Sequence, residues 1–296
     1  SRLTTALTFL ENADRFHGAW SHWINGTTGK VIPFGTKDNG GDIVETSFLC
    51  QGLLTVREYF KNGNTTEKAL AAKADDLWKG VEWDWYTKGE NAMYWHWSPN
   101  YGWEMNFKLE GYNECLITYV LGAASPTHPI PATAYHDAWA RNGAIVNGSS
   151  QYGLPVVLNY NGATGNVGPL FWSQYSYLGM DPRGLTDAYA NYWTLTQNHS
   201  KIINKYCIAN PKQWTGYSDK CWGLTASYTR NTDGSTGYTA HQPLNDTGVI
   251  SPTAALSSFP FTPAESMKFL HYLYDEKKST LVGVAGPYDA FSPHYN

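Results

Sequence analysis

The sequence alternates apolar segments of helical length with loops rich in Trp and Tyr, and this pattern continues along the whole chain. Neither an alternation of strands and helices nor a nucleotide-binding glycine loop after a strand is recognisable. The pattern predicts an all-α fold, a toroid of paired helices that carries its functional groups on the loops of one rim. Helices are expected at 3–16, 42–60, 66–79, 112–123, 133–141, 170–178, 185–206, 252–258 and 263–274, and a short hairpin within 142–168.

Bulk properties narrow the class of protein. Charged residues make up 16% of the 296 residues and the net charge is -4, which argues against nucleic acid or an anionic membrane as partner. No apolar run has transmembrane length, and we expect a removed leader because the chain starts within a helical pattern. Without a shift in composition, residues 1–296 are predicted to form a single domain.

Aromatic residues are unusually frequent, at 15%, with 13 Trp and 21 Tyr. Their rings combine an apolar face with a polar edge, which matches the C–H face and hydroxyl rim of a sugar. Core packing and glycan binding both remain explanations for this composition.

Three carboxylates, here called the acidic trio (Asp38, Asp42 and Glu45), stand at the start of the expected helix 42–60. Asp42 and Glu45 are three residues apart and so share one face of a helix. The turn signal NGG at 39–41 can return the Asp38 side chain towards the other two. Asp42 and Glu45 also fit a helix N-cap and its N3 partner, so capping is the alternative explanation for this pair.

Glu114 is the other candidate acid, because it precedes the apolar run CLITYVL and is expected near the start of a helix. Hydrolysis of a glycosidic bond needs an acid for the leaving oxygen and a carboxylate that acts on water or on the anomeric carbon. One acid must stay protonated near neutral pH, through apolar surroundings or neighbouring carboxylates. Glu114 has the first setting and the acidic trio the second. An ordinary acid in the first turn of a helix is the alternative for Glu114.

Aromatic and polar loop residues are the candidates for substrate contact. For the two histidines among them, hydrogen bonding to a substrate is favoured over metal ligation, and core packing is the alternative. The candidates are His17, Trp20, Trp95, His96, Trp97, Tyr101, Trp103, Glu104, Trp172 and Trp222.

Other chemistries find little support in the sequence. No G-x-S-x-G elbow occurs, and the cationic cluster that a lyase acting on an anionic polymer would need is missing. No Cys/His spacing suggests zinc, so neither a metal nor a cofactor is expected. Cys50 and Cys115 are predicted to be buried thiols, whereas Cys207 and Cys221 could pair in an oxidising compartment.

Several long motifs resemble one bacterial family. They are FHGAWSHW (16–23), GDIVETSFL (41–49), YWHWSPNYGWEMNFKLEGYNECLITYVL (94–121), GPLFWSQYSYLGMDPRGL (168–185), CWGLTAS (221–227) and PTAALSSFPFTPAESM (252–267). The chain is similar to the glucoamylase-like family, glycoside hydrolase family 144, over nearly its whole length. That family contains β-1,2-glucanases and sophorose-releasing enzymes.

The resemblance implies an (α/α)6 barrel, no metal requirement, an inverting mechanism and export to the periplasm or beyond. The family's acids match Asp38, Asp42, Glu45 and Glu114, and we assign Glu114 as general acid and the acidic trio as the group that activates water. Family domains are longer at both ends, so the toroid is expected to be incomplete here.

The expected function is therefore hydrolysis of a β-linked glucan, most simply β-1,2-glucan, by a monomer. A non-catalytic glycan-binding protein is one alternative. The other is a transglycosylase related to the central domain of cyclic β-1,2-glucan synthases.

Overall fold

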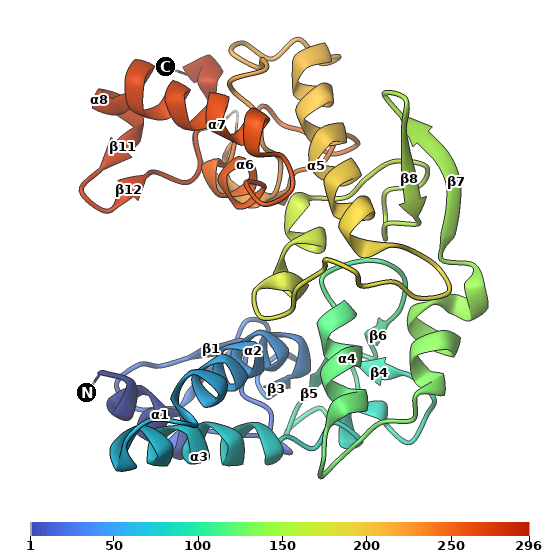
Figure 1. Ribbon diagram of the computed structural model, residues 1–296, viewed down its shortest axis with the longest axis vertical. Helices are drawn as coiled ribbons and strands as arrows, with labels where there is room; N and C mark the ends of the chain where they lie inside the picture. The colour runs from blue at the N-terminus through green and yellow to red at the C-terminus, as the bar shows by residue number, and fades with distance from the viewer. Residues whose placement is uncertain (1, 232, 296) are drawn as a thin grey trace. The chain divides into compact units, whose positions relative to one another are not determined.

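The computed structural model describes residues 2–231 and 233–295 and is rich in helices, as the sequence predicts (Figure 1). The α-helices are α1 (Arg2–Asn12), α2 (Ile43–Phe60), α3 (Thr65–Lys79), α4 (Leu116–Ala124), α5 (Tyr192–Ala209), α6 (Pro252–Ser257), α7 (Pro263–His271) and α8 (Lys278–Leu281). Short 3-10 helices occupy Trp85–Thr87, Arg141–Gly143, Leu170–Ser173, Tyr175–Tyr177 and Pro293–Tyr295, and π-helical turns occupy Tyr135–Trp139 and Tyr272–Glu276.

The strands are short and form antiparallel pairs. The pairs are β1 (Trp23–Ile24) with β2 (Val31–Ile32), β3 (Gly41–Asp42) with β5 (His96–Trp97), and β4 (Met93–Tyr94) with β6 (Lys108–Leu109). The others are β7 (Val146–Gln151) with β8 (Leu154–Leu158), β9 (Ala226–Arg230) with β10 (Thr236–Ala240), and β11 (Val282–Gly283) with β12 (Gly286–Pro287). The hairpin predicted within 142–168 is confirmed as β7–β8.

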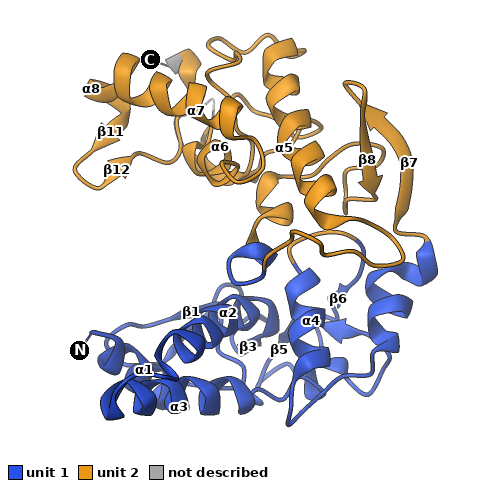
Figure 2. Cartoon of the chain, in the orientation of Figure 1, with its two compact units in different colours: residues 1–111, 115–143, 176–180 blue, residues 112–114, 144–175, 181–296 orange. Residues whose placement is uncertain are grey.

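The chain divides into two compact units (Figure 2). Unit 1 contains residues 1–111, 115–143 and 176–180, and unit 2 contains residues 112–114, 144–175 and 181–296. In unit 1, α2 packs along α3 and also contacts α4, while α1 packs on α3. In unit 2, α5 packs on β8 and on the 3-10 turn 170–173, and α6 packs on α7.

The N-cap that the sequence predicts at Asp42 is present in the structure. Asp42 caps α2, because its side chain accepts hydrogen bonds from the amides of Val44 and Glu45. At α3, Asn64 and Glu67 form a reciprocal capping box. These local interactions explain why the sequence alone locates both helix starts to within one residue.

Two predicted helix starts are wrong. The sequence places Glu114 inside a helix from 112, but α4 begins at Leu116, since Tyr112 is engaged in a parallel bridge with Tyr160. The helix predicted from 185 begins at Tyr192, because the carboxylate of Asp187 accepts hydrogen bonds from the amides of Tyr189 and Ala190 and holds a turn. In both places a non-helical hydrogen bond replaces the first helical turn.

The four cysteines are free and buried in the structure. Cys50 and Cys115 agree with the prediction of buried thiols, and the disulfide considered for Cys207 and Cys221 is not formed. Among the described residues, no helix combines the length and the apolar character that crossing a bilayer requires.

Gly18 allows the loop before β1 to approach the end of α3 closely. Its φ is 76°, and a Cβ at this position would lie 2.0 Å from the carbonyl oxygen of Gly80. Alanine would therefore meet both an unfavourable backbone conformation and a backbone clash. We expect Gly18→Ala to lower the free energy of unfolding by about 3 kcal/mol, measured by urea denaturation.

Gly184 provides the matched control, because its φ is 75° and a Cβ added there would meet no atom within 4 Å. Gly184→Ala should lower the free energy of unfolding by only about 1 kcal/mol, the cost of placing alanine at a positive φ. Equal losses in the two variants would contradict the close approach at Gly18.

A buried histidine links several polar side chains in the core of unit 2. His199 is fully buried, and its Nε2 lies 2.7 Å from the carbonyl oxygen of Gly168. A carbonyl only accepts, so Nε2 carries the proton, and Nδ1 accepts from the Ser173 hydroxyl at 2.7 Å. Ser173 is also fully buried, so this Ser–His contact has a structural role and is not a nucleophile open to substrate.

Burial lowers the pKa of His199 from 6.5 to about 3. Below pH 6.5 the His199 imidazole is protonated in the unfolded chain but stays neutral in the folded protein. This residue therefore makes the fold less stable as the pH falls. We expect His199 to remove about 2 kcal/mol of unfolding free energy between pH 6.5 and pH 5. Guanidinium denaturation at several pH values should show a flatter profile for His199→Gln than for the exposed control His271→Gln. Identical profiles would contradict the assignment.

Candidate active site

The acidic trio is brought together by the pairing of β3 with β5, which places Asp42 opposite His96. The turn at 39–41 depends on its glycines, because a Cβ at Gly40 would lie 2.2 Å from the Trp97 carbonyl oxygen. A Cβ at Gly41 would lie 1.8 Å from the Tyr86 hydroxyl. The NGG turn therefore returns Asp38 towards Asp42, as the sequence predicts.

Asp42 is fully buried, and its carboxylate is occupied by hydrogen bonds. Oδ1 accepts from the amides of Val44 at 3.0 Å and Glu45 at 2.9 Å. Oδ2 lies 3.1 Å from Nδ1 of His22 and 3.9 Å from Nε2 of His96. The capping explanation is thus correct for Asp42, and its charge is held between two imidazoles.

Asp38 is also buried, with 6% of its side chain exposed, and its Oδ2 lies 3.3 Å from Nε2 of His96. His96 consequently faces both aspartates with one nitrogen. The sequence predicts that His96 contacts substrate. In the structure, its ring also holds Asp38 next to Asp42.

Glu45 differs from its two neighbours. The backbone amide of Asp42 donates to the carbonyl of Trp20 at 2.9 Å, so Glu45 does not complete a capping box. Its side chain is 37% exposed and lines a cavity of about 420 Å³. Burial, and then the charge of Asp42, raise the pKa of Glu45 to about 7, against the opposing effect of His22. Glu45 is thus the member of the acidic trio that is available for proton transfer.

His22 is a functional candidate that the sequence reasoning missed. Its Nδ1 lies 3.1 Å from Asp42 and 3.9 Å from Glu45, and its ring stacks on Phe34 at 4.1 Å. The hydrogen bond to Asp42 raises the pKa of His22, although burial opposes it. The sequence signal that could have identified His22 is its position in the aromatic loop SHW, next to Trp23.

The cavity beside Glu45 is formed by residues of unit 1. Trp23 is 51% exposed there, whereas Trp20 is almost completely buried and donates its indole N–H to the carbonyl of Leu10. Trp20 is therefore mainly a core residue behind the cavity wall, and not the exposed substrate contact that the sequence predicts. The lining is Trp20, Ser21, His22, Trp23, Ile24, Ile32, Glu45, Thr46 and Leu49.

Two groups of side chains in the described part of the chain have a spacing that a divalent cation could use. They are His22, Asp42 and Glu45, and Asp38, Asp42 and His96, each with ligand atoms within 4.8 Å of one another. Asp42 belongs to both groups, and its Oδ1 is already taken by two backbone amides. The hydrogen bond between His22 and Asp42 accounts for the first arrangement without an ion, and the ion-pair contacts of His96 with Asp38 and Asp42 account for the second.

The aromatic loop separates into two sets of contacts. Trp95 stacks on His96, which lies close to Asp38 and Asp42. Trp97 meets the ring of His17 edge-on at 4.9 Å, and His17 stacks on Trp85. Trp103 lines a different pocket, which contains no member of the trio. Tyr101 is 41% exposed. Glu104 forms an exposed ion pair with Lys37.

The remaining candidates belong to unit 2. Glu114 is buried, with 7% exposure, in the turn before α4 and not in its first turn. Trp172 is half-buried and stacks on Tyr160. Trp222 is fully buried and donates its indole N–H to the carbonyl of Glu265, so the structure corrects its predicted substrate contact to a core role.

Comparison with known proteins identifies the family. A family model described as "Putative glucoamylase" matches residues 106–296. The chain belongs to this glucoamylase family. The matched residues include Glu114 and begin after the acidic trio, and the resemblance inferred from the sequence motifs is confirmed.

Similar solved structures cover the whole chain and so extend the match to the acidic trio. The structure of an endo-β-1,2-glucanase from Chitinophaga pinensis, in complex with sophorotriose and glucose, is 57% identical, with a TM-score of 0.96 over 100% of this chain and 70% of that chain. A β-1,2-glucanase structure from Parabacteroides distasonis is 44% identical, with a TM-score of 0.92 over 100% of this chain and 44% of that chain.

A curated relative is the exo β-1,2-glucooligosaccharide sophorohydrolase (non-reducing end) of Parabacteroides distasonis, 45% identical over 98% of this chain. The chain spans 42% of the length of that relative.

Proposed function

We propose that this protein hydrolyses β-1,2-linked glucan or its oligosaccharides. The observation that carries the proposal is Glu45, a carboxyl whose pKa is raised to about 7 at the wall of a cavity that also contains the exposed Trp23. Acid–base catalysis is most efficient when the pKa of the group lies near the operating pH. The substrate class is taken from the named activities of relatives that are 44–57% identical.

The proposed mechanism uses two glutamates. Glu114 donates a proton to the leaving glycosidic oxygen, and Glu45 removes a proton from the water that attacks the anomeric carbon from the other face, which inverts the configuration. An inverting enzyme needs roughly 6.5–9.5 Å between the two carboxyl groups, to leave room for that water.

The residues around Glu45 position it and tune its pKa in this mechanism. They are Asp38, Asp42, His22 and His96. The hydrogen bonds of Asp42 fix the first turn of α2, and with it the backbone of Glu45. The negative charge of Asp42 also keeps the pKa of Glu45 high. Asp38 and His96 hold the adjoining end of the turn 39–41.

The packing of α2 along α3 supports the proposal that the fold is of the (α/α)6 toroid type. We also propose that the protein acts as a monomer outside the cytoplasm, where an exported glucan would be met. Both statements extend the family assignment and the sequence-based expectations.

The test is product analysis of purified protein with β-1,2-glucan. Release of reducing ends, with products of inverted anomeric configuration by NMR, is the expected result. Binding without release would favour a non-catalytic glycan-binding protein. Products longer than the substrate, or cyclic products, would favour the transglycosylase alternative. Either result would contradict the hydrolase proposal.

A further inference from the structure

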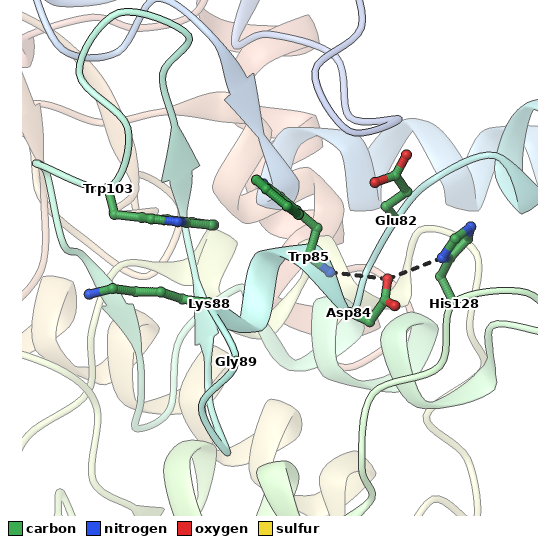
Figure 3. Close-up of a pocket in the computed structure, with 7 residues that line it drawn as sticks. All are labelled: Glu82, Asp84, Trp85, Lys88, Gly89, Trp103 and His128. Carbon is green, nitrogen blue, oxygen red and sulfur yellow. Dashed lines mark hydrogen bonds and ion pairs between the residues drawn. The ribbon is translucent and has the colours of Figure 1, made fainter.

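A second pocket in unit 1 lies apart from the acidic trio. Its volume is about 420 Å³, and none of Asp38, Asp42 and Glu45 lines it. A volume of this size lies in the range of roughly 300–1,000 Å³ that small-molecule sites occupy. Figure 3 shows the seven lining residues, which are Glu82, Asp84, Trp85, Lys88, Gly89, Trp103 and His128.

Two tryptophans give this pocket a broad aromatic surface. The rings of Trp85 and Trp103 are 6.4 Å apart and tilted by 33°. Trp85 is held by stacking on His17 at 3.6 Å and still leaves 39% of its surface exposed. Trp103 meets Tyr86 and Tyr94 edge-on, so its indole is also fixed. Such rigid rings bind an apolar face with little loss of conformational entropy.

Polar groups surround the two rings and are held in place by other contacts. Oδ1 of Asp84 accepts from the amide of Trp85 at 3.0 Å and lies 3.1 Å from Nδ1 of His128 (Figure 3). Glu82 is oriented by Nδ1 of His17 at 3.0 Å. Lys88 donates to Asn106 at 2.9 Å. Donors and acceptors therefore stand at fixed positions around an aromatic surface.

The charges of the pocket select among possible ligands. Two carboxylates disfavour an anion such as a phosphate, and the ammonium of Lys88 disfavours a cation held against the indoles. A neutral polyhydroxylated ring has an apolar C–H face for the indoles and hydroxyl groups for the surrounding donors and acceptors. We propose that the Trp85–Trp103 pocket is a second saccharide site, which binds glucose units of a β-linked glucan without cleaving them.

This inference takes its ligand class from the proposed function, but binding here does not depend on cleavage. A site that retains a glucan next to a separate hydrolytic centre would raise the local concentration of substrate at that centre. In this proposal Trp103 contacts glucan at a site other than the acidic trio.

The test uses full-length protein labelled with 5-fluorotryptophan and titrated with sophorose, a β-1,2-linked glucose disaccharide. The ¹⁹F resonances of Trp85 and Trp103, assigned with Trp85→Phe and Trp103→Phe, should shift in a saturable manner. Asp84→Asn should weaken this binding about tenfold, because the carboxylate both accepts hydrogen bonds and holds His128. Asp181→Asn, a change at an exposed acid paired with Arg183 in unit 2, should leave the binding curve unchanged.

The outcomes separate the two proposals. Resonances of Trp85 and Trp103 that stay fixed up to the solubility limit of sophorose would overturn the second site, as would Asp84→Asn binding with wild-type affinity and an unchanged melting temperature. Choline shifting these resonances while sophorose does not would assign the pocket to a cation instead. Saturable sophorose binding at these two rings by a protein that releases no product would leave this inference standing and remove only the hydrolase.

Discussion

Glu45→Gln is expected to reduce the hydrolysis of β-1,2-glucan by about 10²–10⁴-fold. Glutamine keeps the size of the side chain but cannot accept the proton of the attacking water. Glu45 is partly exposed and its carboxylate does not cap α2, so the fold should retain its stability. The measurements are the rate of reducing-end release and the melting temperature of the same preparation.

Glu67→Gln is the matched control, because Glu67 occupies the same N3 position of α3 that Glu45 occupies in α2. Glu67 accepts a hydrogen bond from the amide of Asn64 at 2.8 Å, and glutamine can accept the same bond. Hydrolysis by this variant should equal that of the wild type. Near-normal turnover by Glu45→Gln would remove Glu45 from the reaction.

Glu114→Gln is expected to lower the hydrolysis of β-1,2-glucan by about 10²–10⁴-fold, but to spare a substrate with a good leaving group. A nitrophenolate leaves without protonation, so an aryl β-sophoroside does not need the proton donor. Comparison of kcat/KM for the two substrates is the measurement. For Glu45→Gln, in contrast, both substrates should be affected, because both need an activated water.

Glu265 serves as the control for Glu114, because it is also a glutamate of unit 2 near a helix start but has no assigned role. Glu265→Gln should act on both substrates like the wild type. If Glu114→Gln loses the two activities in equal proportion, Glu114 is not the proton donor. The acid would then have to be sought among the other buried carboxyls.

The sequence predicts local features well wherever neighbouring residues decide them. The start of α2 follows from the N-cap Asp42, and the start of α3, predicted at Thr66, lies at Thr65. The starts of α4 and α5 were misplaced, because the bridge of Tyr112 with Tyr160 and the turn held by Asp187 compete with the helix. The bridge joins residues 48 positions apart, so no local pattern could reveal it.

Residue types and spacing alone determined the helix-rich character, the family resemblance and the four candidate acids, since these depend on periodicity and on side chains close in the chain. The different roles within the acidic trio were decided only by tertiary structure. The carboxylate of Asp42 accepts hydrogen bonds from two backbone amides and is hydrogen-bonded to His22. The carboxyl of Glu45 instead lines a cavity, and its pKa is raised to about 7. Burial and the placement of charges set these roles, and both arise when β3 pairs with β5 and the aromatic loops close around the start of α2.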